Sequence, residues 1–174
     1  MSNLDPKHLA LLDEARERGQ ADTGGLRLCL ELLALAGSID RDCAARLAPH
    51  RLSEGKFVLL FLLRGRTEGL SPHELATRAG VTRATITGLL DGLERDGFLV
   101  REGGMTDRRR IAVRLTPQGE TTADMMFREH TAWIETLFSG LDRDERDVLG
   151  KLLARVWQKT DNGRRATARP DRAP

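Results

Sequence analysis

Two short amphipathic segments that meet at Gly80 constrain the fold of this chain more than any other feature. The first begins with a capping box, in which the Ser71 hydroxyl and the Glu74 carboxylate can each accept a hydrogen bond from the other residue's backbone N–H. Gly80 can take the positive φ that redirects the chain after this helix, and Thr82 can cap the next one. Ala76 is small enough to let the two helices approach closely. The spacing therefore predicts a helix-turn-helix.

A β-hairpin is expected directly after the second helix. Residues 98–100 and 111–115 are rich in β-branched and other apolar side chains, and the stretch between them is polar, glycine-containing and rich in arginine. A helix-turn-helix followed by a hairpin is a winged helix-turn-helix. The predicted fold class is mainly α with a small β-hairpin wing, completed by a helical lobe.

Long amphipathic helices are expected on both sides of this unit. Apolar side chains recur every three or four positions over residues 26–47, and the stripe is wider than one small lobe can cover, which indicates a subunit interface. A helix is predicted over 116–139, and a second capping box at 142–145 begins another. Residues 1–24 contain a short accessory helix. Residues 159–174 have little to bury and are expected to be disordered.

Composition and charge limit the class of protein. The 174 residues are 40% hydrophobic, enough for one compact structural unit, and the net charge of +2 does not by itself indicate a nucleic-acid partner. No run approaches the roughly 20 consecutive apolar residues that span a bilayer, and the N-terminus lacks the pattern of a signal peptide. We therefore expect a soluble, cytoplasmic protein with no membrane partner.

Two exposed groups of side chains are candidates for contact with double-stranded DNA. The outward face at the start of the second helix carries short or hydrogen-bonding groups that can enter the major groove, namely Thr82, Arg83, Ala84, Thr85 and Thr87. The tip of the hairpin carries consecutive arginines that need an anionic partner such as phosphate, in the run Asp107, Arg108, Arg109 and Arg110. Asp107 is expected to orient Arg109 for entry into the narrow minor groove.

The sequence resembles the MarR (multiple antibiotic resistance regulator) family over residues 26–156. The resemblance rests on Ser71-x-x-Glu74-Leu75-Ala76, Thr82-Arg83-Ala84-Thr85-Ile86-Thr87, Leu93-Glu94-Arg95-Asp96-Gly97-Phe98-Leu99, and Asp107-x-Arg109 followed by Val113-x-Leu115-Thr116-x-x-Gly119. It implies a homodimer joined by the first long helix and the last two, a wing that reads the minor groove, and a small aromatic or phenolic effector bound where the two lobes meet. Gly88 and Arg110 depart from the family pattern, since relatives often carry a basic residue and a small residue there.

Further residues concern the control of DNA binding. Arg46, His50 and Arg51 lie near the predicted junction of the dimer and DNA lobes, where they can bind a carboxylate or phenolate effector or form interlobe salt bridges. Cys43 lies on the apolar stripe and suits a small core residue, as does Cys29, although a redox role or a disulfide between subunits stays open. The chain has no tyrosine, whereas the resemblance implies tyrosines around the thiolate of the family's peroxide sensors.

No catalytic or metal-binding pattern stands out. The four histidines lack zinc-site spacing, and the chain has no glycine-rich phosphate loop, nucleophile elbow or paired acids, so we expect no metal, no cofactor and no enzyme. The predicted function is a sequence-specific DNA-binding transcription regulator, a repressor released by a small-molecule effector. The alternatives are a dimeric protein-interaction module of the same fold and a thiol-based redox-sensing regulator.

These inferences divide the chain into five parts. They are an accessory N-terminal helix (1–24), a dimerisation helix (25–50), a winged helix-turn-helix DNA-binding lobe (51–116), C-terminal dimerisation helices (117–158) and a disordered basic tail (159–174).

Overall fold

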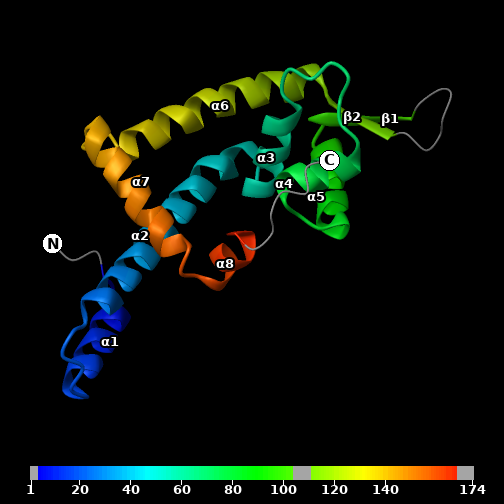
Figure 1. Cartoon of the computed structure of the whole chain (residues 1–174). Coiled ribbons are helices and arrows are strands. Elements are labelled where there is room, and N and C mark those ends of the chain that lie inside the picture. Colours follow the sequence, from blue (N-terminus) through cyan, green and yellow to red (C-terminus); the bar gives the residue numbers. More distant parts are fainter. Residues whose placement is uncertain (1–3, 104–110, 168–174) are drawn as a thin grey trace. The chain divides into compact units, whose positions relative to one another are not determined.

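The structure, a computed structural model, describes residues 4–103 and 111–167 (Figure 1). Along the chain the elements are α1 (Pro6–Glu17), α2 (Gly24–Leu47), the 3-10 helix η1 (Ala48–His50), α3 (Glu54–Leu63), α4 (Pro72–Ala79), α5 (Arg83–Arg95), β1 (Leu99–Gly103), β2 (Ile111–Leu115), α6 (Pro117–Leu137), α7 (Arg143–Trp157) and α8 (Asp161–Thr167). They form two compact units that divide within α6 after Phe127. The mainly helical fold with one hairpin confirms the predicted fold class. None of the helices in the two described ranges is long and apolar enough to cross a membrane.

The helix-turn-helix is built from the predicted capping signals. The Glu74 N–H donates to the Ser71 hydroxyl at 3.2 Å, and the Ser71 N–H donates to the Glu74 carboxylate at 2.8 Å. The hydrogen bond between the Ser71 hydroxyl and this carboxylate, and then the one from the Ser71 N–H, hold the pKa of Glu74 below its usual value. Gly80 ends α4 with φ +66°. The Thr82 hydroxyl then caps α5 by accepting from the Thr85 N–H at 3.2 Å.

The hairpin is tied to the start of α4 through its second strand. β1 and β2 pair antiparallel, from Leu99 opposite Leu115 to Gly103 opposite Ile111. On its other edge, β2 forms a bridge in which Val113 donates to Leu70 at 2.8 Å and accepts from it at 3.1 Å. β2 therefore has backbone partners on both sides, and the hairpin and α4 are held in one unit.

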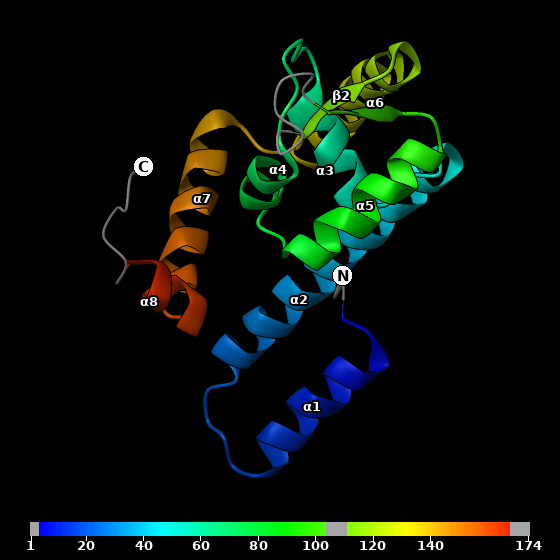
Figure 2. The same cartoon turned by 90° about the vertical axis from the view of Figure 1, so that its right-hand side faces the viewer.

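The core of the first unit lies between α3, α4, α5, the hairpin and the two long helices that flank them in sequence. Its buried side chains include Leu47, Leu59, Leu60, Leu63, Leu75, Ile86, Leu90, Leu93, Leu99, Val113 and Met126. Burying a side chain of this size contributes about 1.5–3 kcal/mol. A smaller cluster of Leu4, Leu12 and Leu30 joins α1 to α2 (Figure 2).

The end of the chain differs from the predicted disordered tail of residues 159–174. Asp161–Thr167 form α8 in the second unit, and residues 168–174 lie outside the described residues. The Thr160 hydroxyl accepts from the Gly163 N–H at 3.0 Å, and Asp161 pairs with Arg164 one turn later. A hydroxyl cap and a carboxylate in the first turn are local signals that favour a helix. They were not recognised because the prediction for residues 159–174 rested on composition.

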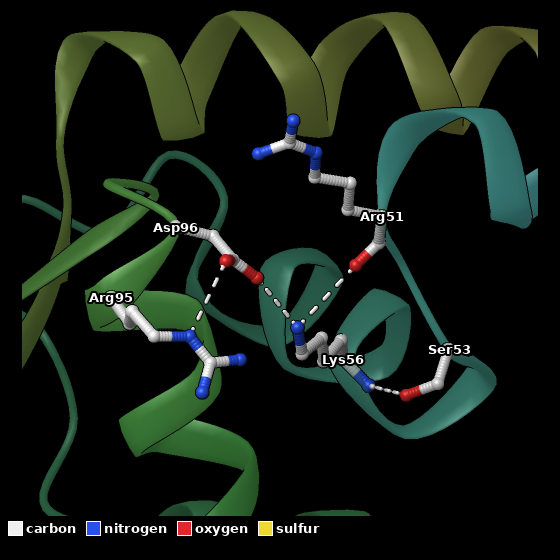
Figure 3. Close-up of polar contacts among 5 residues, drawn as sticks. All are labelled: Arg51, Ser53, Lys56, Arg95 and Asp96. Atoms are coloured by element: carbon white, nitrogen blue, oxygen red, sulfur yellow. Dashed lines mark hydrogen bonds and ion pairs between the residues drawn. The ribbon is translucent and has the colours of Figure 1, made fainter.

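A largely buried ion pair joins α3 to the end of α5 (Figure 3). Lys56 Nζ lies 2.6 Å from a carboxylate oxygen of Asp96 and 3.3 Å from the carbonyl oxygen of Arg51, and the two paired side chains are only 16% and 14% exposed. The hydrogen bond from Lys56 lowers the pKa of Asp96, and the charges of Lys56, Arg95 and Arg51 lower it further. A methyl group on Gly92 would lie 2.8 Å from Lys56 Cε, so the glycine leaves room for this lysine.

We expect Asp96→Asn to lower the free energy of unfolding at neutral pH and to have less effect in acid. The folded carboxyl has a pKa below the ordinary 3.8, so its stabilisation is fully present well above that value and is lost as the pH falls through the lower folded pKa. The difference in free energy of unfolding between the two proteins is measured by urea unfolding at several pH values from neutral to about pH 3. The range must approach the pKa, because protonation of Asp96 changes the free energy of unfolding only there. Asp13→Asn, at an exposed pair with Arg16, is the control. A difference that grows in acid would contradict the assignment.

Gly119→Ala should destabilise the folded protein by about 3 kcal/mol, the cost of forced overlap in a packed site. A methyl group at Gly119 would overlap the carbonyl oxygen of Phe98, which accepts from the Thr116 N–H at 3.0 Å. Gly88→Ala is the matched control, since Gly88 has open space around it and an alanine in a helix should stabilise by about 1 kcal/mol. Urea unfolding at one protein concentration compares the free energies of unfolding of the two variants. Equal changes would contradict the close approach of Gly119 to the carbonyl oxygen of Phe98.

Candidate nucleic-acid interface

The predicted reading face of α5 is exposed along the first half of the helix. Because Ile86, Leu90 and Leu93 pack into the core, the opposite side of the helix is left to solvent. All of the residues predicted there are exposed, namely Thr82, Arg83, Ala84, Thr85 and Thr87. Next to them, Gly88 leaves the surface open. The structure therefore brings the predicted helix residues together on one surface.

Hydrogen bonds within this face decide which groups are available to a ligand. The hydroxyls of Thr82 and Thr85 lie 2.9 Å apart, and the Thr87 hydroxyl donates to the Arg83 carbonyl oxygen at 2.9 Å. The Thr87 oxygen can still accept and its methyl group is free for apolar contact. Within the described part of the chain, the Arg83 guanidinium has no hydrogen bond or ion pair. It is thus the strongest donor available on this face.

The second half of α5 carries acidic residues that the sequence analysis did not single out. Asp91 and Glu94 are exposed, and both interact with Arg101 of β1. Arg114 of β2 pairs with Glu102 across the hairpin at 3.3 Å. Asp91 and Glu94 meet Arg101 only in the folded unit, because the acids lie on a helix and the arginine on the following strand. Two acids three residues apart are too common in helices to predict this contact.

The predicted wing residues Asp107, Arg108, Arg109 and Arg110 lie outside the described residues. They belong to the segment that joins β1 to β2, between Gly103 and Ile111.

A pocket of about 270 Å³ lies in the first unit where α5 ends and α6 begins. It is lined by Pro49, His50, Arg51, Asp96, Phe98, Gln118 and Thr122. Two of the three predicted effector residues, His50 and Arg51, are therefore brought together, whereas Arg46 does not line this pocket. Arg51 has a left-handed backbone, φ +57°, at the turn after η1. The pocket has cationic and aromatic groups and shares Asp96 with the ion pair of Figure 3.

The thiols do not form a redox pair within the chain. Neither Cys29 nor Cys43 is in a disulfide within the described residues, and Cys43 packs against the core of the first unit. Burial raises the pKa of Cys43, and the charges of Glu54 and Asp40 raise it further, which keeps the thiol protonated and weakly nucleophilic. Across residues 4–103 and 111–167, no group of three or more metal-ligating side chains comes together.

Comparison with known proteins gives matches in sequence and in fold. Residues 52–111 match the MarR family. The HTH-type transcriptional repressor YetL of Bacillus subtilis (strain 168) is 35% identical over 155 residues, which cover 88% of this chain and 93% of YetL. FabT of Streptococcus pneumoniae in complex with DNA has a TM-score of 0.65 at 24% identity, over 76% of this chain and 94% of FabT. CouR from Rhodococcus jostii RHA1 bound to p-coumaroyl-CoA has a TM-score of 0.61 at 23% identity, over 76% of this chain and 93% of CouR.

The match to YetL extends well beyond the helix-turn-helix, since it covers nearly the whole of both chains. The solved structures share the same winged fold over most of their length. The capped helices at Gly80, the exposed face of α5 and β1 all lie inside the matched segment 52–111, which ends at the first residue of β2. The chain therefore belongs to the MarR family, and it is a DNA-binding transcription regulator with a winged helix-turn-helix.

Proposed function

We propose that this regulator is a dimeric repressor that places α5 in the major groove of an operator and the segment 104–110 in the adjacent minor groove. The observation that carries the proposal is the exposed face of α5, where short side chains surround an Arg83 guanidinium with no partner in the described part of the chain. Short groups let the helix backbone approach the bases, and an arginine can pair with guanine or with phosphate. YetL is named a repressor, which supports the same role here.

The wing is assigned to Asp107, Arg108, Arg109 and Arg110. Three consecutive arginines repel one another unless phosphates neutralise them, and the paired strands on either side fix where the segment begins and ends. Arg109 enters the minor groove, oriented by Asp107, while Arg108 and Arg110 contact phosphates. FabT, which has the same fold, is known in complex with DNA.

Dimerisation rests on apolar side chains that stay exposed in each unit. On α2, Leu28 and Leu33 are 62% and 61% exposed, and Leu32 and Leu35 extend the stripe. On α7, the exposed apolar residues are Val148, Leu152, Leu153, Val156 and Trp157. Contiguous apolar surface of this kind marks an interaction site, and a second copy would cover both helices in a closed dimer. We therefore assign residues 25–50 and 117–158 to the dimer interface.

The effector site is assigned to the pocket lined by His50 and Arg51. These side chains offer positive charge and hydrogen-bond donors beside Phe98, which suits a small aromatic carboxylate or phenolate. An anion in the pocket competes with Asp96 for Arg51, whose charge helps to keep the pKa of Asp96 low. Because Asp96 follows directly on α5, effector binding changes the support of the reading helix. CouR, which shares the fold, binds p-coumaroyl-CoA.

Arg109→Ala should weaken binding about tenfold to every duplex, because it removes the minor-groove contact, and should lower the salt slope by about one, because it removes one positive charge from the DNA interface. Thr85→Val should instead change the preferred base at one position of each half-site, since it alters only the reading face. The DNA is a duplex selected from a random pool by the wild-type protein, and titration by fluorescence anisotropy at several salt concentrations gives affinity and the number of chains bound. Arg16→Ala on α1 is the control.

Unchanged affinity of Arg109→Ala would contradict the wing assignment, and one chain per duplex would contradict the dimer. A pool that yields no enriched sequence would favour the protein-interaction module.

Arg51→Asn should abolish release of DNA by an aromatic acid without weakening DNA binding itself. Asparagine tolerates the left-handed backbone of this position and lacks the guanidinium. The probe is 4-hydroxybenzoate, titrated into the preformed complex of each protein with the selected duplex. Arg46→Gln is the matched control and should respond like wild type, because Arg46 lies outside the pocket lining. Loss of the response in Arg46→Gln instead of Arg51→Asn would place the effector elsewhere.

A further inference from the structure

The outer edge of β1 meets the second half of α5. Arg101 of β1 stands opposite Val113 of β2, and Val113 uses both its N–H and its carbonyl group on Leu70. Arg101 and Val113 are therefore a pair without mutual hydrogen bonds, and the Arg101 N–H points away from β2. The Glu94 carboxylate of α5 accepts that N–H at 3.3 Å. An acid on α5 thus satisfies a backbone donor at the open edge of the hairpin.

The side chain of Arg101 strengthens the same link. Its Nη2 donates to the carboxylate of Asp91, and its Nε lies 3.6 Å from Glu94 Oε2. The arginine side chain is 26% exposed, whereas both acids are more exposed than that. One guanidinium therefore bridges two carboxylates of α5, only two residues before β1 ends at Gly103.

Asp91 continues the face that α5 presents to DNA. It follows Ala84 by seven residues, which on an α-helix is close to two full turns and about 10.5 Å along the axis. Thr87 and Gly88 lie between them on the same side. Without a cation beside it, the Asp91 carboxylate would extend this face with a negative charge, and the phosphates of a bound duplex would repel it.

We propose that Arg101 is a positioning residue for DNA recognition, which neutralises Asp91 and Glu94 on α5 and fixes the base of the hairpin to that helix. The proposal rests on the placement of α5 in the major groove given above. Arg101 itself acts through the two acids and not through DNA. Its pairing fixes β1 relative to α5, up to the end of the strand at Gly103.

The expected effect lies in binding and not in folding. Ion pairs whose acids are largely exposed contribute little to stability, so the midpoint of thermal unfolding should shift by only a few degrees when the pair is removed. Arg101→Gln leaves two uncompensated carboxylates on α5 and should weaken binding to the selected duplex about tenfold. Asp91→Asn alone should bind as well as wild type or slightly better, because it removes a negative charge from the DNA-facing side.

The double variant Asp91→Asn with Arg101→Gln separates this role from direct contact with DNA. If Arg101 acts by neutralising Asp91, the double variant recovers most of the lost affinity, to within about threefold of wild type. If Arg101 contacts phosphate directly, the double variant stays as weak as Arg101→Gln, which would overturn the proposal. Fluorescence anisotropy with the duplex selected by the wild-type protein measures all three variants at the same salt concentration.

Arg114→Gln is the matched control, since it removes an arginine from the same hairpin that pairs with Glu102 of β1 and not with α5. It should leave the affinity within about threefold of wild type, because a largely exposed cross-strand pair contributes little. Equal losses of DNA affinity in Arg101→Gln and Arg114→Gln would overturn the proposal, because they would indicate a general effect of removing positive charge from the hairpin. Wild-type affinity in Arg101→Gln would overturn it while leaving the proposed function intact, because Arg109→Ala tests that function separately.

Discussion

Burial of one side of α5 is the constraint on which the rest of the winged unit depends. Ile86, Leu90 and Leu93 pack into the core of the first unit, and this packing alone leaves the opposite side of the helix exposed. Rotation of α5 by one residue would expose leucines and bury Arg83, at a cost of several kcal/mol for each misplaced group. Packing therefore fixes which residues of α5 are exposed, and the caps at Ser71 and Thr82 fix where the helices begin.

Ionic contacts act on α5 at its other end. Lys56 pairs with Asp96 just after the helix, and Arg101 pairs with Glu94 and Asp91, two and five residues earlier. The Lys56–Asp96 pair connects α5 with α3 and with the pocket that contains His50, and the Arg101 contacts connect α5 with the hairpin. Helix α5 thus connects the pocket that contains His50 with the hairpin, and an anion bound near either ionic contact would act on it electrostatically.

The fold was predictable because its signals are local. Capping residues, Gly80 and the run of apolar positions in α5 each lie within a few residues of the structure that they specify. The exposed reading face followed from the same periodicity. The Arg101 contacts and the Lys56–Asp96 pair were not predictable, since 40 residues separate Lys56 from Asp96 and nothing in either neighbourhood marks the partner. α8 was missed because the composition of residues 159–174 outweighed a short cap at Thr160.

The distribution of charge matters more to this regulator than its total. A net charge of +2 on 174 residues gives weak attraction to DNA of arbitrary sequence, because non-specific affinity grows with the number of phosphates neutralised. Acids on the second half of α5 pair with Arg101 of the chain itself, whereas the Arg83 guanidinium has no partner among the described residues, and the sequence adds three consecutive arginines at 108–110. A protein arranged in this way gains affinity only where groove shape and bases fit both elements at once. Specificity depends on the ratio of operator to non-specific affinity, so low overall charge with local positive groups serves a repressor better than a uniformly basic surface.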